Sequence, residues 1–150
     1  MTILDGDVVR THLSKELKFS VAHRNINVAR MGFVASEVVK HGGIAICSSI
    51  APFEKSREAT RRLVEPTGGG FLLVHISTSA EDCAARDVKG LYRQAMQGTI
   101  ELTGVSHPYE NPENAELTID GGKVPVEDSV RYIVGWLVTN GYLNADLVSV

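Results

Sequence analysis

The 150-residue sequence has no apolar run long enough to cross a membrane. A spanning helix needs about 20 consecutive apolar residues, and polar residues interrupt each apolar stretch well before that length. The N-terminus also has no basic segment followed by a long apolar one, which is the pattern of a secretory signal. These absences predict a cytoplasmic protein with no membrane partner.

Cysteine is scarce as well. Only Cys47 and Cys83 occur, each inside an apolar-looking segment, so the sequence predicts two plain buried thiols rather than a disulfide or a metal pair. The five histidines do not have the spacing of metal ligands. We therefore expect no metal site built from protein side chains alone.

Charge is distributed unevenly along the chain. Residues 1–64 carry 10 Lys and Arg against 6 Asp and Glu, whereas residues 65–150 carry 5 against 12. A basic half in an acidic protein favours a local anionic ligand. The interleaving of basic and aromatic residues that single-stranded nucleic acid requires is absent, so no nucleic-acid partner is expected.

Short apolar runs alternate with helical patterns. We expect strands at residues 2–4, 44–47, 71–76 and 116–120, and helices at 7–14, 21–41, 56–64, 80–86 and 126–140. Ser20 and Ser79 are the expected N-caps of two of these helices. The alternation predicts an α/β fold with a buried parallel sheet, helices on both faces, and ligands at the carboxyl ends of the strands. The polar segment 87–114 has a length typical of a lid or a disordered loop.

Five segments carry a family resemblance. LDGDVVRTHL, HRNINVARMGFVA, ICSSIAPF, ARDVKGLY and TGVSHPYENPEN, in this order, resemble adenylylsulfate kinases, above all the kinase domain fused to ATP sulfurylase in bacterial bifunctional enzymes. The resemblance runs from about residue 3 to residue 138. It implies a single P-loop NTPase-type domain over residues 1–150 with a lid at 87–114.

The resemblance also implies an activity. Adenylylsulfate kinases use ATP and Mg²⁺ to phosphorylate the 3′-hydroxyl of adenosine 5′-phosphosulfate (APS), which gives PAPS for sulfate assimilation. The implied partners are APS, ATP, an ATP sulfurylase domain and further copies of the chain in a homo-oligomer.

One part of the family pattern is missing. In the family, a central first strand, a glycine-rich Walker A loop and a helix precede the part present here, but no GxxxxGK[ST] motif occurs in these 150 residues. The glycines at 68–70 lack the lysine and the hydroxyl. We therefore expect an incomplete domain with two unpaired strand edges, which is inactive as a kinase alone. The alternative is a non-catalytic, sulfonucleotide-binding regulatory domain of an ATP sulfurylase.

The resemblance assigns roles to individual residues. It makes Asp7 the catalytic carboxylate, which orients the hydroxyl or holds Mg²⁺ through water, although capping of the following helix is the alternative. Arg86 is assigned to ATP. The residues assigned to APS are Arg10, Phe19, Arg24, Asn27, Ile50, Lys89 and Leu102. Phe19 and Leu102 take the two adenine-stacking positions, and Lys89 is the lid cation. The alternatives are solvated helix charges for Arg10 and Arg24, and a core position for Phe19.

Several residues depart from the family pattern. Ala51 lacks a hydroxyl, Glu54 reverses the charge of the usual arginine, and Gln94 and Met96 replace two lid cations. Leu102 stands where the family has phenylalanine. Loss of a stacking ring weakens binding by about 1–3 kcal/mol per base, so these changes imply reduced turnover.

Overall fold

The computed structural model describes residues 1–147 and divides into two compact units. Unit 1 comprises Met1–Phe71 and Glu101–Asn111, and unit 2 comprises Leu72–Ile100 with the chain from Pro112 onward. Each unit is described by itself. The single domain expected over residues 1–150 stays a prediction, and its last three residues lie outside the described part.

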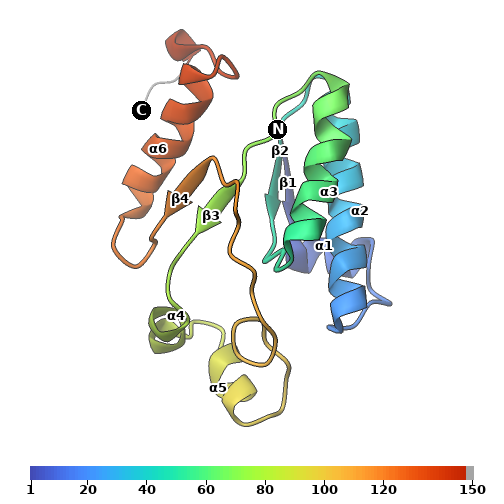
Figure 1. Ribbon diagram of the computed structural model, residues 1–150, viewed down its shortest axis with the longest axis vertical. Coiled ribbons are helices and arrows are strands. Elements are labelled where there is room, and N and C mark those ends of the chain that lie inside the picture. The colour runs from blue at the N-terminus through green and yellow to red at the C-terminus, as the bar shows by residue number, and fades with distance from the viewer. Residues whose placement is uncertain (148–150) are drawn as a thin grey trace. The chain divides into compact units, whose positions relative to one another are not determined.

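The elements follow the expected order (Figure 1). They are β1 (Thr2–Asp5), α1 (Gly6–His12), α2 (Val21–Lys40), β2 (Ala45–Ser48), α3 (Glu54–Val64), the 3-10 turn η1 (Glu65–Thr67), β3 (Val74–Ile76), α4 (Ala80–Arg86), α5 (Leu91–Met96), β4 (Leu117–Ile119), α6 (Val126–Thr139) and the 3-10 turn η2 (Ala145–Leu147). No helix within residues 1–147 is both long and apolar enough to cross a membrane.

Unit 1 is a two-stranded parallel sheet with packed helices. β1 runs parallel to β2, with Thr2 opposite Ala45 and Asp5 opposite Ser48. The predicted cap of α2 is confirmed, because the Ser20 side chain accepts from the His23 N–H. α2 and α3 lie side by side (Figure 1).

The core of unit 1 lies between β1, α1 and α2. Its buried residues are Leu4, Val9, Met31 and Ala35. Between α2 and α3, Gly32 permits a close approach: a Cβ on Gly32 would lie 2.7 Å from the Thr60 hydroxyl oxygen. This packing holds α2 rigidly beside the strand ends that carry the predicted site.

Unit 2 is a second two-stranded parallel sheet with a sparse core. β3 pairs with β4, with Val74 opposite Leu117 and Ile76 opposite Ile119. The predicted N-cap Ser79 is confirmed, since its hydroxyl accepts from the Asp82 N–H at 3.0 Å. α6 has no buried residue within this part of the chain.

The expected α/β class with parallel strands and flanking helices is confirmed, but the predicted burial of the strands is wrong. Ile46 in β2 is 46% exposed, Ile76 in β3 is 56% exposed, Cys47 is exposed and Cys83 is only partly buried. The described strands pair in two separate sheets, so each strand has a strand neighbour on one edge only. An apolar run shows that a strand requires cover, but it does not show that cover is present.

The strand predicted at 71–76 is also shorter than expected, beginning at Val74. The backbone N–H of Leu73 donates to the Glu116 carboxylate at 2.7 Å. The Glu116 side chain thus accepts the Leu73 N–H hydrogen bond that a longer β3 would make to a backbone carbonyl of the neighbouring strand.

Candidate functional site

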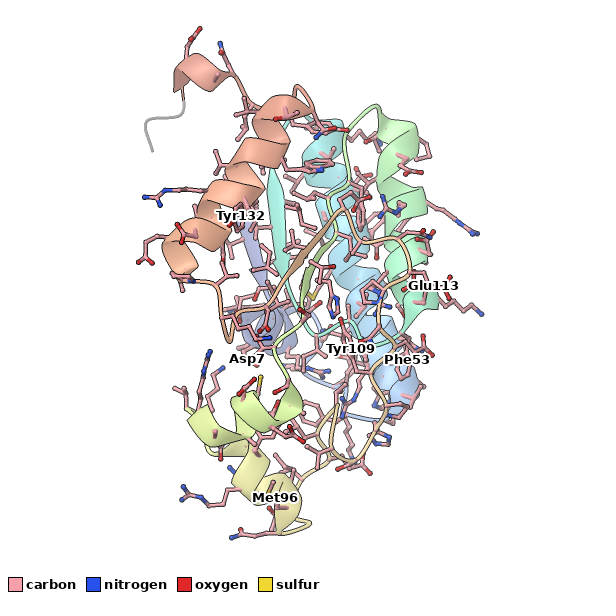
Figure 2. All side chains as sticks on the ribbon, turned by 60° about the vertical axis from the view of Figure 1, so that its left-hand side comes forward. Asp7, Phe53, Met96, Tyr109, Glu113 and Tyr132 are labelled. Atoms are coloured by element: carbon pink, nitrogen blue, oxygen red, sulfur yellow. The ribbon has the colours of Figure 1, made fainter. Side chains whose placement is uncertain are left out.

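The turn from β1 into α1 presents two carboxylates at the carboxyl end of β1 (Figure 2). Asp5 is the N-cap of α1, because its Oδ1 accepts from the N–H groups of Asp7 at 2.9 Å and Val8 at 3.2 Å. The capping alternative for Asp7 is therefore wrong. Asp7 stands exposed in the first turn of α1. Its catalytic assignment stays a prediction.

Arg10, Phe19 and Arg24, which the family resemblance assigns to APS, lie close together in unit 1. The guanidinium carbon of Arg10 lies 4.6 Å from the centroid of the Phe19 ring, a cation–π contact. Arg24 Nε donates to the Phe19 carbonyl at 2.6 Å. Phe19 is 56% exposed, so the core alternative for this residue is wrong. The exposed ring beside the Arg10 guanidinium suits a planar, anionic ligand.

Arg24 is buried, with 8% exposure, so it is not the solvated helix charge of the alternative interpretation. Besides Phe19, it donates to the Thr103 hydroxyl and, at 3.3 Å, to the Glu101 carbonyl. Burial lowers the pKa of the Arg24 guanidinium, an effect that the Glu101 charge opposes and the Arg10 charge adds to. Arg24 thereby fixes the segment holding Leu102, which is half-buried.

Thr103 and Glu101 are site residues that sequence reasoning missed. They lie 79 and 77 residues from Arg24 along the chain, and no local pattern connects positions so far apart. The hydrogen bonds from the buried Arg24 to Thr103 and Glu101 become visible only in the folded structure.

Asn27 follows one helical turn after Arg24 on α2 and is 5% exposed. Its Nδ2 faces the Met31 sulfur at 3.8 Å, and its Oδ1 is the one buried side-chain polar atom among the described residues that has no hydrogen-bond partner. An unsatisfied buried acceptor costs about 1–3 kcal/mol. Buried groups of this kind are commonly satisfied by a bound water or by a small movement of the side chain.

The β2–α3 loop is held by Arg57, which is 3% exposed. Its guanidinium pairs with Glu54 and donates to the carbonyls of Ala51 and Glu110, each at 2.7 Å. Ala51 has a left-handed backbone, with φ of 39°. Ile50 beside it is 56% exposed. Glu54, the charge reversal noted in the sequence, thus neutralises a buried arginine.

The same loop contacts the returning segment 101–111. The Tyr109 ring centroid lies 5.6 Å from the Arg57 guanidinium carbon, and Figure 2 shows Tyr109 near Phe53. The Glu110 backbone N–H donates to the Pro52 carbonyl at 2.9 Å. The second half of the predicted lid segment is therefore anchored in unit 1. Tyr109 and Glu110 lie in the TGVSHPYENPEN segment that carries the family resemblance, but the sequence analysis assigned no role to either.

Unit 2 holds the two remaining predicted residues. Arg86, at the end of α4, donates to the Gly121 carbonyl at 3.1 Å. Lys89 is exposed in the turn between α4 and α5, where the Asp87 carboxylate accepts from the first N–H groups of α5. The assignments of Arg86 to ATP and Lys89 to the substrate stay predictions.

Metal-ligating side chains do not gather within residues 1–147, where no three His, Cys, Asp or Glu form a possible site. Protein-bound Mg²⁺ commonly uses only one or two carboxylates together with substrate phosphates. A role for Asp7 toward Mg²⁺ would therefore depend on a bound nucleotide.

Comparisons with known proteins agree with these observations. The sequence profile of the family described as adenylylsulphate kinase matches residues 1–120. Sulfate adenylyltransferase of Aspergillus terreus is 45% identical over 145 residues, which are 96% of this chain and 26% of that protein. The protein of the same name from Emericella nidulans is 46% identical over 143 residues, 95% of this chain and 25% of that one. The chain thus spans about a quarter of the length of these relatives.

Solved structures give the same result. The Mycobacterium tuberculosis APS kinase CysC, in complex with AMPPNP and APS, superposes with a TM-score of 0.86 at 31% identity, over 91% of this chain and 79% of that one. The hexameric APS kinase from Thiobacillus denitrificans gives a TM-score of 0.70 at 39% identity, over 95% of this chain and 23% of that one. Together with the paired parallel strands and the residue geometry of unit 1, these likenesses show that the chain belongs to the adenylylsulfate kinase family.

Proposed function

We propose that this chain is the APS-binding part of an adenylylsulfate kinase and that unit 1 forms the sulfonucleotide site. Membership of the family supports this proposal, as does the complex of the Mycobacterium tuberculosis relative with APS and AMPPNP. The reaction would be transfer of a phosphoryl group from ATP to the 3′-hydroxyl of APS. We also propose that the protein is located in the cytoplasm.

The placement of Arg10, Phe19 and Arg24 close together in unit 1 is the observation that carries the proposal. Arg24 and Arg10 lie close enough that the charge of Arg10 lowers the pKa of Arg24. An anion near both guanidinium groups would offset their mutual repulsion, and guanidinium N–H groups pair well with phosphate and sulfate oxygens. An adenosine phosphosulfate would supply the anion and a ring to stack on Phe19.

ATP fits these residues poorly. No backbone cradle with a lysine is encoded in the 150 residues, and phosphoryl transfer depends on neutralising the β- and γ-phosphates. MgATP would supply the phosphoryl group once polypeptide outside the described residues provides such a loop. Asp7 would then orient the attacking hydroxyl. We expect the chain alone to form no ADP or PAPS above an enzyme-free control.

Calorimetry of two asparagine variants tests the APS site. Asn27→Leu removes a polar side chain that the family resemblance assigns to APS, so it should weaken APS binding by about tenfold or more without lowering the melting temperature. Asn25→Leu on the same helix is the matched control, since Asn25 Oδ1 accepts from the Ser56 hydroxyl at 2.8 Å. It should lower the melting temperature and leave APS affinity unchanged. Unaltered APS affinity in Asn27→Leu, or tighter binding of ATP than of APS, would contradict the proposal.

A non-catalytic regulatory domain of an ATP sulfurylase is the second candidate. The buried pairing of Glu54 with Arg57 favours it. The sulfate adenylyltransferase relatives, about four times as long as this chain, support a sulfurylase domain as partner. This candidate predicts binding of APS or PAPS with no turnover even when a Walker A segment is supplied.

A further inference from the structure

The Phe19 ring lies on a segment without regular secondary structure. α1 ends at His12 and α2 begins at Val21, and residues 13–20 between them form neither helix nor strand. Phe19 is 56% exposed, so core packing holds its ring only weakly. The position of the ring therefore depends on hydrogen bonds to the backbone on either side of it. A ring that is held before the ligand arrives loses less conformational freedom on binding.

Two of the residues that hold this backbone are already assigned to APS. Arg10 Nη1 donates to the Lys18 carbonyl at 3.2 Å, and Arg24 Nε donates to the Phe19 carbonyl at 2.6 Å. These carbonyls belong to the peptide groups on either side of Phe19, so the two arginines hold both groups. Because both guanidinium groups are also proposed to contact the ligand, substituting them cannot separate positioning from binding.

His23 holds the same backbone, and the resemblance assigns it no role. Its Nδ1 accepts a hydrogen bond from the Lys18 backbone N–H at 2.9 Å. The His23 side chain is partly buried, and its place is set by the start of α2, where the His23 backbone N–H donates to the Ser20 cap at 3.4 Å. Because the donor to the ring is a backbone N–H, Nδ1 must carry a lone pair. His23 is therefore neutral in this arrangement, with its proton on Nε2.

We propose that neutral His23 is a positioning residue for APS, which holds the Lys18 N–H and thereby keeps the Phe19 ring in place to stack on adenine. The inference rests on the proposed function of unit 1. In a protonated imidazole both nitrogens are donors, so Nδ1–H would face the Lys18 N–H as one donor against another. The hydrogen bond is then lost, and the backbone before Phe19 is released. Because imidazole changes its charge between about pH 5 and 8, APS affinity should fall as the pH is lowered through that range.

The charged side chains around the loop support such a change. They are Glu16, Lys18, Arg10 and Arg24. A backbone hydrogen bond and the Arg30 guanidinium lower the pKa of the Glu16 carboxyl, and a charge on His23 acts in the same direction. Glu16 therefore offers a protonated His23 an opposite charge in place of the Lys18 N–H. Lysine and arginine side chains titrate well above pH 8, so a change in affinity between pH 5 and 8 points to a histidine.

Calorimetry of APS binding at pH 8 and pH 5.5 tests this role. The parent chain should bind APS about tenfold more weakly at pH 5.5, on the scale of a lost base–aromatic contact. His23→Asn should bind equally at both pH values, because its Oδ1 can accept in the place of Nδ1 but does not titrate. His23→Leu has no acceptor and should bind about tenfold more weakly than the parent does at pH 8, at both pH values.

Two other histidines provide matched controls. His41 is exposed at the C-terminal end of α2, and His107 lies with its Nε2 3.1 Å from the Glu101 carboxylate, in the segment that Arg24 anchors. His41→Asn and His107→Asn should both keep the pH dependence of the parent chain, because neither ring holds the Lys18 N–H.

A double-mutant cycle tests whether His23 acts through Phe19. In a Phe19→Ala background, His23→Leu should change APS affinity by less than about twofold, because the ring that His23 positions is gone. Hydrogen exchange of the APS-free chain at pH 7 gives an independent readout. The Lys18 amide should exchange about tenfold faster in His23→Leu than in the parent chain or in His23→Asn.

The outcomes separate the two proposals. A parent chain that binds no APS would contradict the proposed function, and the role of His23 with it. APS binding that does not depend on pH, a pH dependence that His107→Asn abolishes, additive effects in the cycle, or unchanged exchange of the Lys18 amide in His23→Leu would contradict the role of His23 alone.

Discussion

Unit 1 and unit 2 each contain a two-stranded parallel sheet, yet they differ in how many side chains they bury and in whether any of these are polar. Of the buried apolar residues within 1–147, six belong to unit 1 and two, Ala95 and Ile119, belong to unit 2. All six buried polar residues of that range belong to unit 1. Unit 1 is thus a small folded body whose polar interior is locked by Arg24 and Arg57. Unit 2 leaves large apolar side chains exposed, among them Ile76, Val88 and Met96.

The largest effect on the difference between the two units is expected from adding the N-terminal segment of the family pattern. A first strand, Walker A loop and helix from a related kinase, fused before Thr2, should provide a strand for unpaired sheet edges and N–H groups for phosphates. Kinase activity should then appear in an assay of ADP and PAPS, at a level below that of typical relatives. The same fusion with its Walker lysine changed to alanine is the control.

Reversions in that fusion separate the two proposed functions. Leu102→Phe and Glu54→Arg should raise the activity further, because they restore a stacking ring and a cation. A fusion that folds cooperatively and binds ATP but shows no turnover after both reversions would support the regulatory domain instead.

Two methionines give a matched pair for stability. Met31 is 2% exposed in the core of unit 1, whereas Met96 is 73% exposed in unit 2. Met31→Ala should lower the free energy of unfolding by about 3 kcal/mol. Met96→Ala should change it by less than about 0.5 kcal/mol. Urea unfolding measures both values, and equal effects would show that the cores do not differ.

Two cations provide a second pair. Arg57→Ala leaves the partly buried Glu54 carboxylate and two carbonyls without their donor, and should cost about 3 kcal/mol. Lys123 of unit 2 forms an ion pair with Asp120, but its side chain is 84% exposed. Lys123→Ala should cost about 0.5 kcal/mol or less. Thermal unfolding of the two variants at low salt measures both losses of stability, and a loss for Lys123→Ala as large as that for Arg57→Ala would contradict this difference.

The smallest expected difference concerns two threonine hydroxyls. Thr103→Val removes the buried acceptor of Arg24 and should cost about 1.5 kcal/mol. Thr99→Val removes an exposed bond to the Gln94 carbonyl and should cost about 0.5 kcal/mol. Only Thr103→Val should also increase proteolytic cleavage near residues 101–111, since Arg24 anchors that segment.

Local sequence signals predicted local structure well. Ser20 and Ser79 marked their helices because a cap acts within three residues of its own position. For Asp7 the sequence left a catalytic and a capping role open, and only the structure shows that Asp5 is the cap of α1.

Long-range features were not predictable in this way. The pairing of Arg24 with Thr103 and of Arg57 with Glu110 joins positions 79 and 53 residues apart. The exposure of Ile46 and Ile76 reflects strands without a second neighbour, which the apolar runs themselves cannot reveal. The family resemblance identified Arg10, Phe19 and Arg24, and the structure brings these three together. That the Asn27 Oδ1 is buried without a hydrogen-bond partner can be seen only in the folded structure.

Hydrogen exchange of the 150-residue chain, with and without APS, tests the central claim that unit 1 holds a sulfonucleotide site. At an APS concentration 100 times its dissociation constant, exchange should slow by about 100-fold around Phe19–Met31 and Glu101–Thr103. β4 and α6 in unit 2 should be unchanged, and ATP at the same concentration should protect neither region. Protection by ATP and not by APS, or APS protection confined to β4 and α6, would contradict the account.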